Sequence, residues 1–145
     1  MEHDFPFMVR RVKWDDAAER LRAVRRNVFI EEQSVPEELE WDGIDERCVH
    51  VMAETAKGQA IGTGRMLPDG HIGRMAVLKP WRRKGVGSAL LTELFGAAKE
   101  LRFECVELSA QTHAIAFYRR HGFEVSSEEY IEAGIPHRTM RRLTG

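Results

Sequence analysis

The sequence predicts an α/β fold in which short strands alternate with amphipathic helices along 145 residues. Three observations support this prediction. The length is that of one ordinary domain, two long segments repeat apolar residues at helical spacing, and short β-rich runs are separated by glycine and proline turns. The predicted order is one strand, one or two helices, three strands, a helix, a strand, a helix and two strands.

Residues 7–12, FMVRRV, predict the first strand, and residues 14–33 predict a helix. The apolar residues of that helix fall at spacings of four, three and four, which places them on one face: Ala17, Leu21, Val24 and Val28. We interpret the arginines of the helix as a solvated face: Arg20, Arg22, Arg25 and Arg26. Residues 34–46 contain Pro36, Gly43 and six carboxylates, which indicates a loop with a short helix.

Residues 48–54 and 59–67 predict the two strands of a hairpin, and a turn at residues 69–70 leads into a third strand that ends at Pro80. The long helix that follows carries one apolar stripe: Val86, Leu90, Leu94, Ala98 and Leu101. The rest of the chain predicts a strand at 105–110, a short helix at 113–122, and final strands at 123–130 and 135–143.

The composition limits the functional classes. Hydrophobic residues make up 43% of the chain and charged residues 31%, which favours a soluble globular protein over a disordered or membrane protein. The formal net charge of −1 disfavours nucleic-acid binding. Cys48 and Cys105 lie in apolar runs without metal-ligand spacing, so we expect reduced cysteines and no metal site. The N-terminal residues lack an apolar stretch preceded by positive charge, which favours a cytoplasmic protein.

The segment RRKGVGS, residues 82–88, precedes the long predicted helix and is typical of a phosphate site. A helix N-terminus has unpaired N–H groups and the positive end of the helix dipole, and glycines there let a phosphate approach the backbone. Arg82, Arg83 and Lys84 add positive charge, and Ser88 adds a hydroxyl. A plain turn has the same local pattern, so this segment alone leaves both interpretations open.

Two familiar nucleotide motifs are excluded. A P-loop requires Lys-Ser/Thr directly after its last glycine, but Ser88-Ala89 follows Gly87. A dinucleotide-binding fingerprint requires a third small residue where Leu90 stands, and GTGRML at residues 62–67 also lacks it.

Two segments together resemble the GNAT superfamily of N-acetyltransferases. Residues 82–87 match its Gln/Arg-x-x-Gly-x-Gly/Ala loop, and residues 108–123, LSAQTHAIAFYRRHGF, are similar to its strand, polar residue and Ala-x-x-Phe/Tyr-Tyr-x-x-x-Gly-Phe segment. Four shorter segments resemble the ElaA/YjcF-like branch: VFIEEQSVP, HVMAE, IGTGRM and EAGIPHRTM. The resemblance implies one domain over residues 1–145, with a mixed, mostly antiparallel sheet of about six to seven strands flanked by about four helices.

The resemblance also implies acetyl-CoA as co-substrate and direct acetyl transfer to a primary amine. Its pyrophosphate would bind the loop through Arg82, Arg83, Lys84, Gly85, Val86, Gly87 and Ser88, and its pantetheine would bind backbone groups of Met75, Ala76 and Val77. Gln111 stands where the family often has a cofactor-contacting asparagine. Tyr118 matches the tyrosine near the thioester sulfur, as general acid or as thiolate stabiliser. A phenol of pKa about 10 gives its proton to a thiolate of about 8.5 only uphill, so both roles stay open.

The acceptor must attack as a neutral amine, and an ammonium of pKa about 10.4 is deprotonated only about once in 2,500 at pH 7. A general base would therefore help. Residues 71–78 lack the glutamate that many relatives carry there. His50 is the best-placed alternative as a base, and the next candidates are His113 and His137. Four acidic residues could attract the cationic amine substrate: Glu31, Glu32, Asp42 and Asp45. A packed histidine and a solvated acidic loop are the simpler interpretations.

A second function from another class stays open, namely a catalytically silent acyl-CoA-binding or regulatory module. Cys48 and Cys105 lie outside any nucleophile arrangement with histidine and a carboxylate, which disfavours a covalent acyl-enzyme. The sequence does not separate small-molecule amines from peptide or protein amines as acceptors. A homodimer is compatible with the resemblance, because family members often dimerise.

Overall fold

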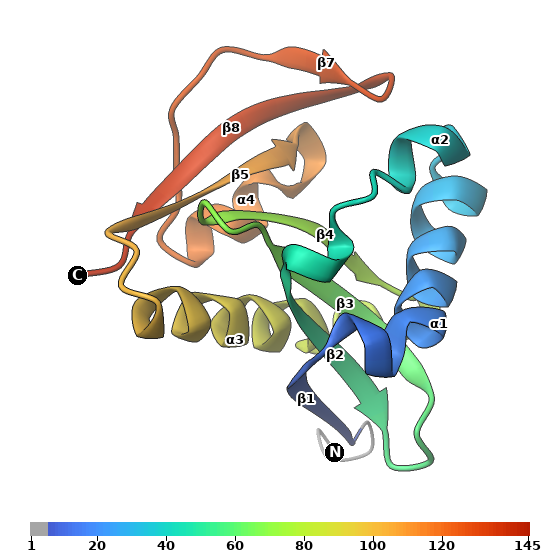
Figure 1. The fold of residues 1–145 in the computed structure, drawn as a ribbon. Coiled ribbons are helices and arrows are strands. Elements are labelled where there is room, and N and C mark those ends of the chain that lie inside the picture. The colour runs from blue at the N-terminus through green and yellow to red at the C-terminus, as the bar shows by residue number, and fades with distance from the viewer. Residues whose placement is uncertain (1–5) are drawn as a thin grey trace.

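The computed structural model describes residues 6–145, in which eight strands form one sheet with helices on both faces (Figure 1). The strands are β1 (Phe7–Val12), β2 (Val49–Thr55), β3 (Ala60–Met66), β4 (His71–Val77), β5 (Cys105–Gln111), β6 (Glu124–Val125), β7 (Tyr130–Glu132) and β8 (Ile135–Leu143). Their order is β1-β2-β3-β4-β5-β8-β6, with β7 also paired to β8. Only β4 and β5 pair in parallel among these strands, so the prediction of a mixed, mostly antiparallel sheet is confirmed.

The helices follow the predicted order. They are α1 (Trp14–Arg25), its π-helical continuation η2 (Arg26–Glu32), α2 (Glu37–Glu40), α3 (Val86–Glu100) and α4 (Ile115–Arg120), with short 3₁₀ turns η3 (Asp45–Arg47), η4 (Lys79–Trp81) and η5 (Thr112–Ala114). Among residues 6–145, no helix is both long and apolar enough to cross a bilayer.

One predicted strand, residues 123–130, is instead two short strands, β6 and β7. The backbone ladder between β6 and β8 is interrupted because the Thr139 N–H donates to the Ser127 hydroxyl, at 2.8 Å, rather than to a backbone carbonyl. The chain leaves β8 at this serine and pairs with it again from Tyr130. This difference accounts for the eighth strand.

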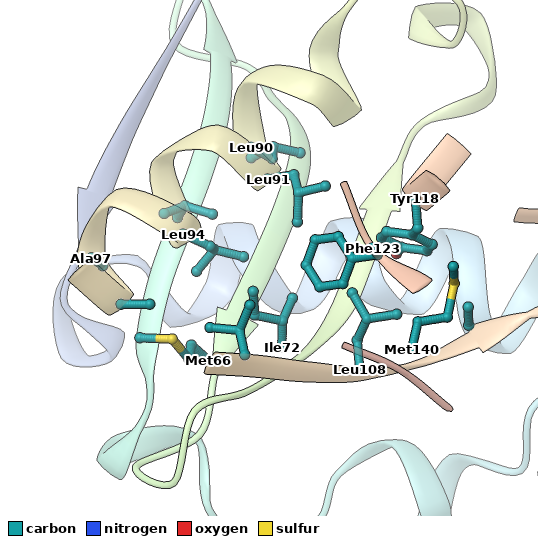
Figure 2. Packing of buried hydrophobic residues seen from close by; sticks show 14 of the residues in the cluster. Met66, Ile72, Leu90, Leu91, Leu94, Ala97, Leu108, Tyr118, Phe123 and Met140 are labelled. Carbon is teal, nitrogen blue, oxygen red and sulfur yellow. The ribbon is translucent and has the colours of Figure 1, made fainter. Parts of the chain in front are cut away.

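The alternation along β2 separates two packed layers. Val51 and Ala53 face the core cluster that contains α3, whereas Met52 packs with Ala17 and Leu21 of α1 on the other face. Figure 2 shows the leucines of α3 pointing toward the strands, with Tyr118 and Phe123 on the same side. Leu90, Leu91 and Leu94 are at most 2% exposed. Burial of each such side chain stabilises the fold by about 1.5–3 kcal/mol.

The parallel strands β4 and β5 pair only at one end. His71 pairs with Glu107 and Ile72 with Leu108, and the pairing stops there. At this closed end the His71 ring also contacts two carboxylates, with Nδ1 2.9 Å from Asp69 and Nε2 3.0 Å from Glu107. Beyond it the strands diverge (Figure 1). We call the diverging segments, residues 73–77 of β4 and 109–111 of β5, the fork.

A β-bulge shapes the β4 arm of the fork. Thr63 pairs with Ala76 and Arg65 with Gly73, so two residues of β4, Arg74 and Met75, stand opposite one residue of β3. Arg74 adopts φ 51°, which is uncommon for a side chain other than glycine. The bulge turns Ala76 toward the cluster formed by η2, while Met75 and Val77 pack with the α3 cluster.

The glycines of GTGRML allow α3 to pack closely on β3. A Cβ on Gly64 would lie 2.7 Å from Met75 Sδ and 2.9 Å from Leu94 Cδ1. We expect Gly64→Ala to destabilise the fold by about 1–3 kcal/mol, because both neighbours belong to the packed core. Gly73→Ala is the matched control, since nothing lies within 4 Å of a Cβ there, and it should change stability by less than about 0.5 kcal/mol. Equal urea midpoints for the two variants would contradict this packing account.

Candidate functional site

The N-terminus of helix α3 has no side-chain cap. Gly85 is the N-cap residue at φ 85°, a left-handed conformation that glycine adopts without strain. No side-chain cap hydrogen bond satisfies the N–H groups of the first turn of α3, and such unpaired groups at a helix N-terminus can bind an anion. A Cβ on Gly87 would lie 3.4 Å from Phe117 Cζ, so α4 borders this turn. Arg83 is exposed beside it, and Lys84 is half-buried.

Ser88, in the same turn, already has a side-chain partner. Its hydroxyl lies 2.9 Å from Nε2 of His121, which follows α4. The His121 ring also contacts the Phe117 ring, with a centroid separation of 4.9 Å. The first turn of α3 is thus connected to α4 by both a polar and an aromatic contact.

Arg82 is used differently from the sequence-based expectation of a phosphate cation. Its Nε donates to the Val77 carbonyl at 2.8 Å, and Nη1 and Nη2 donate to the two carboxylate oxygens of Glu32 at 2.7 and 2.6 Å. All three nitrogens of the side chain therefore have partners within the chain. Glu32, which was predicted to contact the amine substrate, instead pairs with Arg82 of this loop.

The backbone of the β4 arm has one edge that is not paired with β5. Met75, Ala76 and Val77, predicted to contact the pantetheine, lie on this arm beyond the last β4–β5 pair. Opposite them, Gln111 ends β5, and its side chain pairs with that of Gln33. Gln111 Nε2 donates to Gln33 Oε1 at 2.9 Å, and Gln33 Nε2 lies 3.4 Å from Gln111 Oε1. Sequence reasoning missed Gln33.

Tyr118, on α4, belongs to the core cluster that contains α3. Its ring packs edge-on against Phe117 and Phe123, with centroid separations of 5.1 and 5.9 Å, and its side chain is 9% exposed. Burial raises the pKa of Tyr118 to about 12. The raised pKa keeps the phenol protonated near pH 7, and because the hydroxyl has no hydrogen-bond partner within residues 6–145 it is available as a donor.

His50 does not fit the predicted role of a base. It is 1% exposed, its ring contacts Trp14, and its Nε2–H donates to the Asp45 carbonyl at 2.8 Å. Burial lowers the pKa of His50, so the ring is neutral near pH 7. A substrate amine cannot reach a ring nitrogen that is sealed inside the α1 face of the sheet.

A buried cluster of ion pairs lies beside His50 and includes Asp45, so the Asp45 carboxylate is not available to bind the amine substrate. Arg25 donates to Glu40 and to Asp45, each at 2.7 Å, and Arg65 donates to Asp45 at 2.9 Å. Burial alone would raise the pKa of Asp45, but the hydrogen bond from Arg25 and the contact with Arg65 hold it below its usual value. The cluster fastens the acidic loop to α1 and β3.

The remaining acidic residues and histidines lie in three places: in this cluster, on the surface, and, for His137, buried on β8. Arg65 also binds Asp42, and although burial opposes it, this contact lowers the pKa of Asp42 to about 2. Glu31 and His113 are exposed. His137 is 6% exposed, with Nδ1 2.7 Å from the Ile135 carbonyl. Within the described residues, no group of three or more histidine, cysteine or acidic side chains could hold a metal.

Comparison with known proteins assigns the family. The acetyltransferase (GNAT) domain model matches residues 15–144. The uncharacterized N-acetyltransferase YjcF of Bacillus subtilis is 38% identical over 123 residues, which covers 82% of this chain and 87% of that protein. An acyl-CoA N-acyltransferase from Pseudomonas aeruginosa is 33% identical and superposes with a TM-score of 0.83, covering 94% of this chain and 99% of that one.

Escherichia coli ElaA is 26% identical, with a TM-score of 0.84 over 94% of this chain and 99% of that one. The sequence resemblance is thus matched by a family model, and the overall fold by solved structures of the same extent. The chain therefore belongs to the GNAT acetyltransferase family, in the branch of ElaA and YjcF, and is an acyl-CoA-dependent N-acyltransferase.

Proposed function

We propose that this chain, as a single domain over residues 1–145, transfers the acetyl group of acetyl-CoA to a primary amine. The observation that carries the proposal is the proximity of three features. These are the uncapped N-terminus of α3, the unpaired edge of the β4 arm, and the free hydroxyl of Tyr118. A Cβ on Gly87, in the first turn of α3, would lie 4.0 Å from Val77 Cγ2 and 3.4 Å from Cζ of Phe117, the neighbour of Tyr118.

The pyrophosphate of acetyl-CoA would bind the first turn of α3. The N–H groups of residues 85–88 supply hydrogen bonds and the positive end of the dipole, and Arg83 adds charge. The loop conformation supports this assignment, because Gly85 and Arg83 both adopt positive φ and so turn the chain sharply into the helix.

The pantetheine would lie along residues 75–77. A strand edge without a neighbouring strand presents N–H and C=O groups at the spacing of a β-ladder, and the amide-containing pantetheine arm can pair with them. A backbone N–H on this edge that faces the thioester carbonyl would also stabilise the oxyanion of the tetrahedral intermediate. Such a donor contributes about 3 kcal/mol to the transition state.

Tyr118 would act on the leaving sulfur as a hydrogen-bond donor. Its pKa of about 12 lies about 3.5 above that of an ordinary thiol, so full proton transfer to the thiolate would cost about 5 kcal/mol. A hydrogen bond to a charged acceptor, by contrast, is worth about 1.5–3 kcal/mol. The magnitudes favour thiolate stabilisation, with the proton finally supplied by water.

The amine attacks the carbonyl carbon, the carbon–sulfur bond breaks, and the amine proton leaves to water. We assign no protein base to this step, because His50 is sealed and Asp45 is bound by two arginines. Direct attack also agrees with the cysteines: burial raises the pKa of the Cys48 thiol, which donates to the Ile44 carbonyl, and the Cys105 sulfur accepts from Arg141 at 3.3 Å.

Calorimetric titration together with steady-state kinetics tests the acyl donor. We expect acetyl-CoA to bind with one site per chain, and propionyl-CoA and longer acyl-CoAs to support slower turnover than acetyl-CoA. A chain that binds none of these donors would refute the function, and equal turnover with long acyl chains would refute the acetyl assignment.

A further inference from the structure

The end of η2 contacts both arms of the fork through consecutive residues. Glu32 binds Arg82, whose Nε holds the Val77 carbonyl at the end of the β4 arm. Gln33 binds Gln111 at the end of the β5 arm. A segment distant from both strands in sequence thus joins the two diverging ends.

The π-helical turn at the end of η2 packs on β4 and leads directly into Gln33. The Gln33 N–H donates to the Val28 carbonyl at 3.1 Å, five residues back. Val28 and Phe29 anchor this turn on Ala76 of β4. Because consecutive side chains on a helix point in different directions, the last residue of η2 and the residue after it reach different partners.

The Glu32–Arg82 pair is too exposed to matter much for global stability. The two side chains are 36% and 34% exposed, and exposed pairs contribute little to unfolding free energies. The hydrogen bonds from Arg82 lower the pKa of Glu32, so the carboxylate stays charged near pH 7. The pair nevertheless has bidentate geometry and an additional bond to Val77, which fixes the direction of the Val77 carbonyl.

We propose that Glu32 and Gln33 are positioning residues that set the separation of the fork arms, acting through Arg82 and Gln111. The proposal rests on the function given above, in which the fork holds the pantetheine. The alternative is that Arg82 is a phosphate ligand that Glu32 blocks in the free protein, and the two hypotheses predict opposite changes in acetyl-CoA affinity when Glu32 loses its charge. Removing the Glu32 charge weakens acetyl-CoA binding in the first case and tightens it in the second.

The test for the β4 arm is the acetyl-CoA Kd of Glu32→Gln measured by calorimetry. We expect a Kd about 5- to 10-fold higher than that of the wild type, with an unchanged urea midpoint. Glu31→Gln, the exposed neighbour, is the control and should keep the wild-type Kd. Arg82→Lys keeps the charge but loses the bidentate guanidinium geometry. A positioning role therefore predicts a loss of acetyl-CoA affinity similar to that of Glu32→Gln, and no further loss in the double variant.

The test for the β5 arm uses the chemistry of the amide pair. Gln33→Leu removes both hydrogen bonds and should raise the Kd about 3- to 5-fold. Gln33→Glu keeps an oxygen that accepts the 2.9 Å bond from Gln111, so it should restore most of the affinity. If Gln33 only filled space, Gln33→Leu and Gln33→Glu would have the same acetyl-CoA Kd.

The outcomes separate the two levels of the proposal. No binding of acetyl-CoA to the wild type would overturn the proposed function and the positioning role together. Wild-type binding with an equal or lower Kd for Glu32→Gln would overturn the positioning role alone. Full affinity of Arg82→Lys would do the same, because charge without geometry would then suffice.

Discussion

Gly87→Glu is expected to abolish acetyl-CoA binding. The new carboxylate would stand in the first turn of α3, where the pyrophosphate is proposed to bind. Two unit charges about 4 Å apart repel by about 4 kcal/mol at an effective dielectric constant of 20, which corresponds to a loss of about 1,000-fold. The fold should survive, because an acidic residue at a helix N-terminus is favourable.

Gly87→Ala is the matched control for this variant. Its Cβ would lie 3.4 Å from Phe117 Cζ, which is ordinary contact, and it adds no charge. We expect near wild-type affinity for Gly87→Ala in calorimetry, and similar thermal unfolding for both variants. Unchanged acetyl-CoA affinity in Gly87→Glu would remove the phosphate assignment.

Tyr118→Phe is expected to lower turnover roughly 10- to 100-fold while leaving the acetyl-CoA Kd nearly unchanged. The variant removes only the hydroxyl, whose hydrogen bond to the leaving thiolate is worth about 1.5–3 kcal/mol in the transition state. Because burial raises the pKa of Tyr118 to about 12, the phenol stays protonated through neutral and mildly alkaline pH. Wild-type turnover should therefore show no loss from Tyr118 ionisation up to about pH 10.

Steady-state kinetics with calorimetry on the same samples would measure both quantities. The retained Kd serves as the internal control that the ring still packs against Phe117 and Phe123. Wild-type turnover in Tyr118→Phe would exclude the assigned role. A large rise in Kd instead would indicate that the hydroxyl holds the cofactor in the ground state.

The sequence was sufficient for features that depend on local patterns. Leu90 and Leu94 fall on one helical stripe, and Gly85 and Gly87 mark the loop before it, so α3 and its N-terminus were predictable. The division of residues 123–130 into β6 and β7 was not, because it depends on one hydroxyl, that of Ser127, replacing a backbone acceptor.

The contacts that define the fork were not predictable from local patterns. Glu32 and Arg82 are separated by 50 residues and Gln33 and Gln111 by 78, so no periodicity relates them. The predicted solvated face of α1 was wrong for Arg25, which is 1% exposed. One signal could have shown this, since Arg25 is four residues after Leu21 and thus lies on the apolar stripe.

Thiol release from acetyl-CoA, measured against a panel of amines with Tyr118→Phe beside the wild type, tests the central claim most directly. The panel should include polyamines, aminoglycosides, amino acids and peptides with free N-termini or lysines. We predict release that depends on one class of amine, matched by an equal amount of acetylated amine, and slower in the variant. Acetyl-CoA binding without amine-dependent release from any member of the panel would contradict the transferase and favour a silent acyl-CoA-binding module.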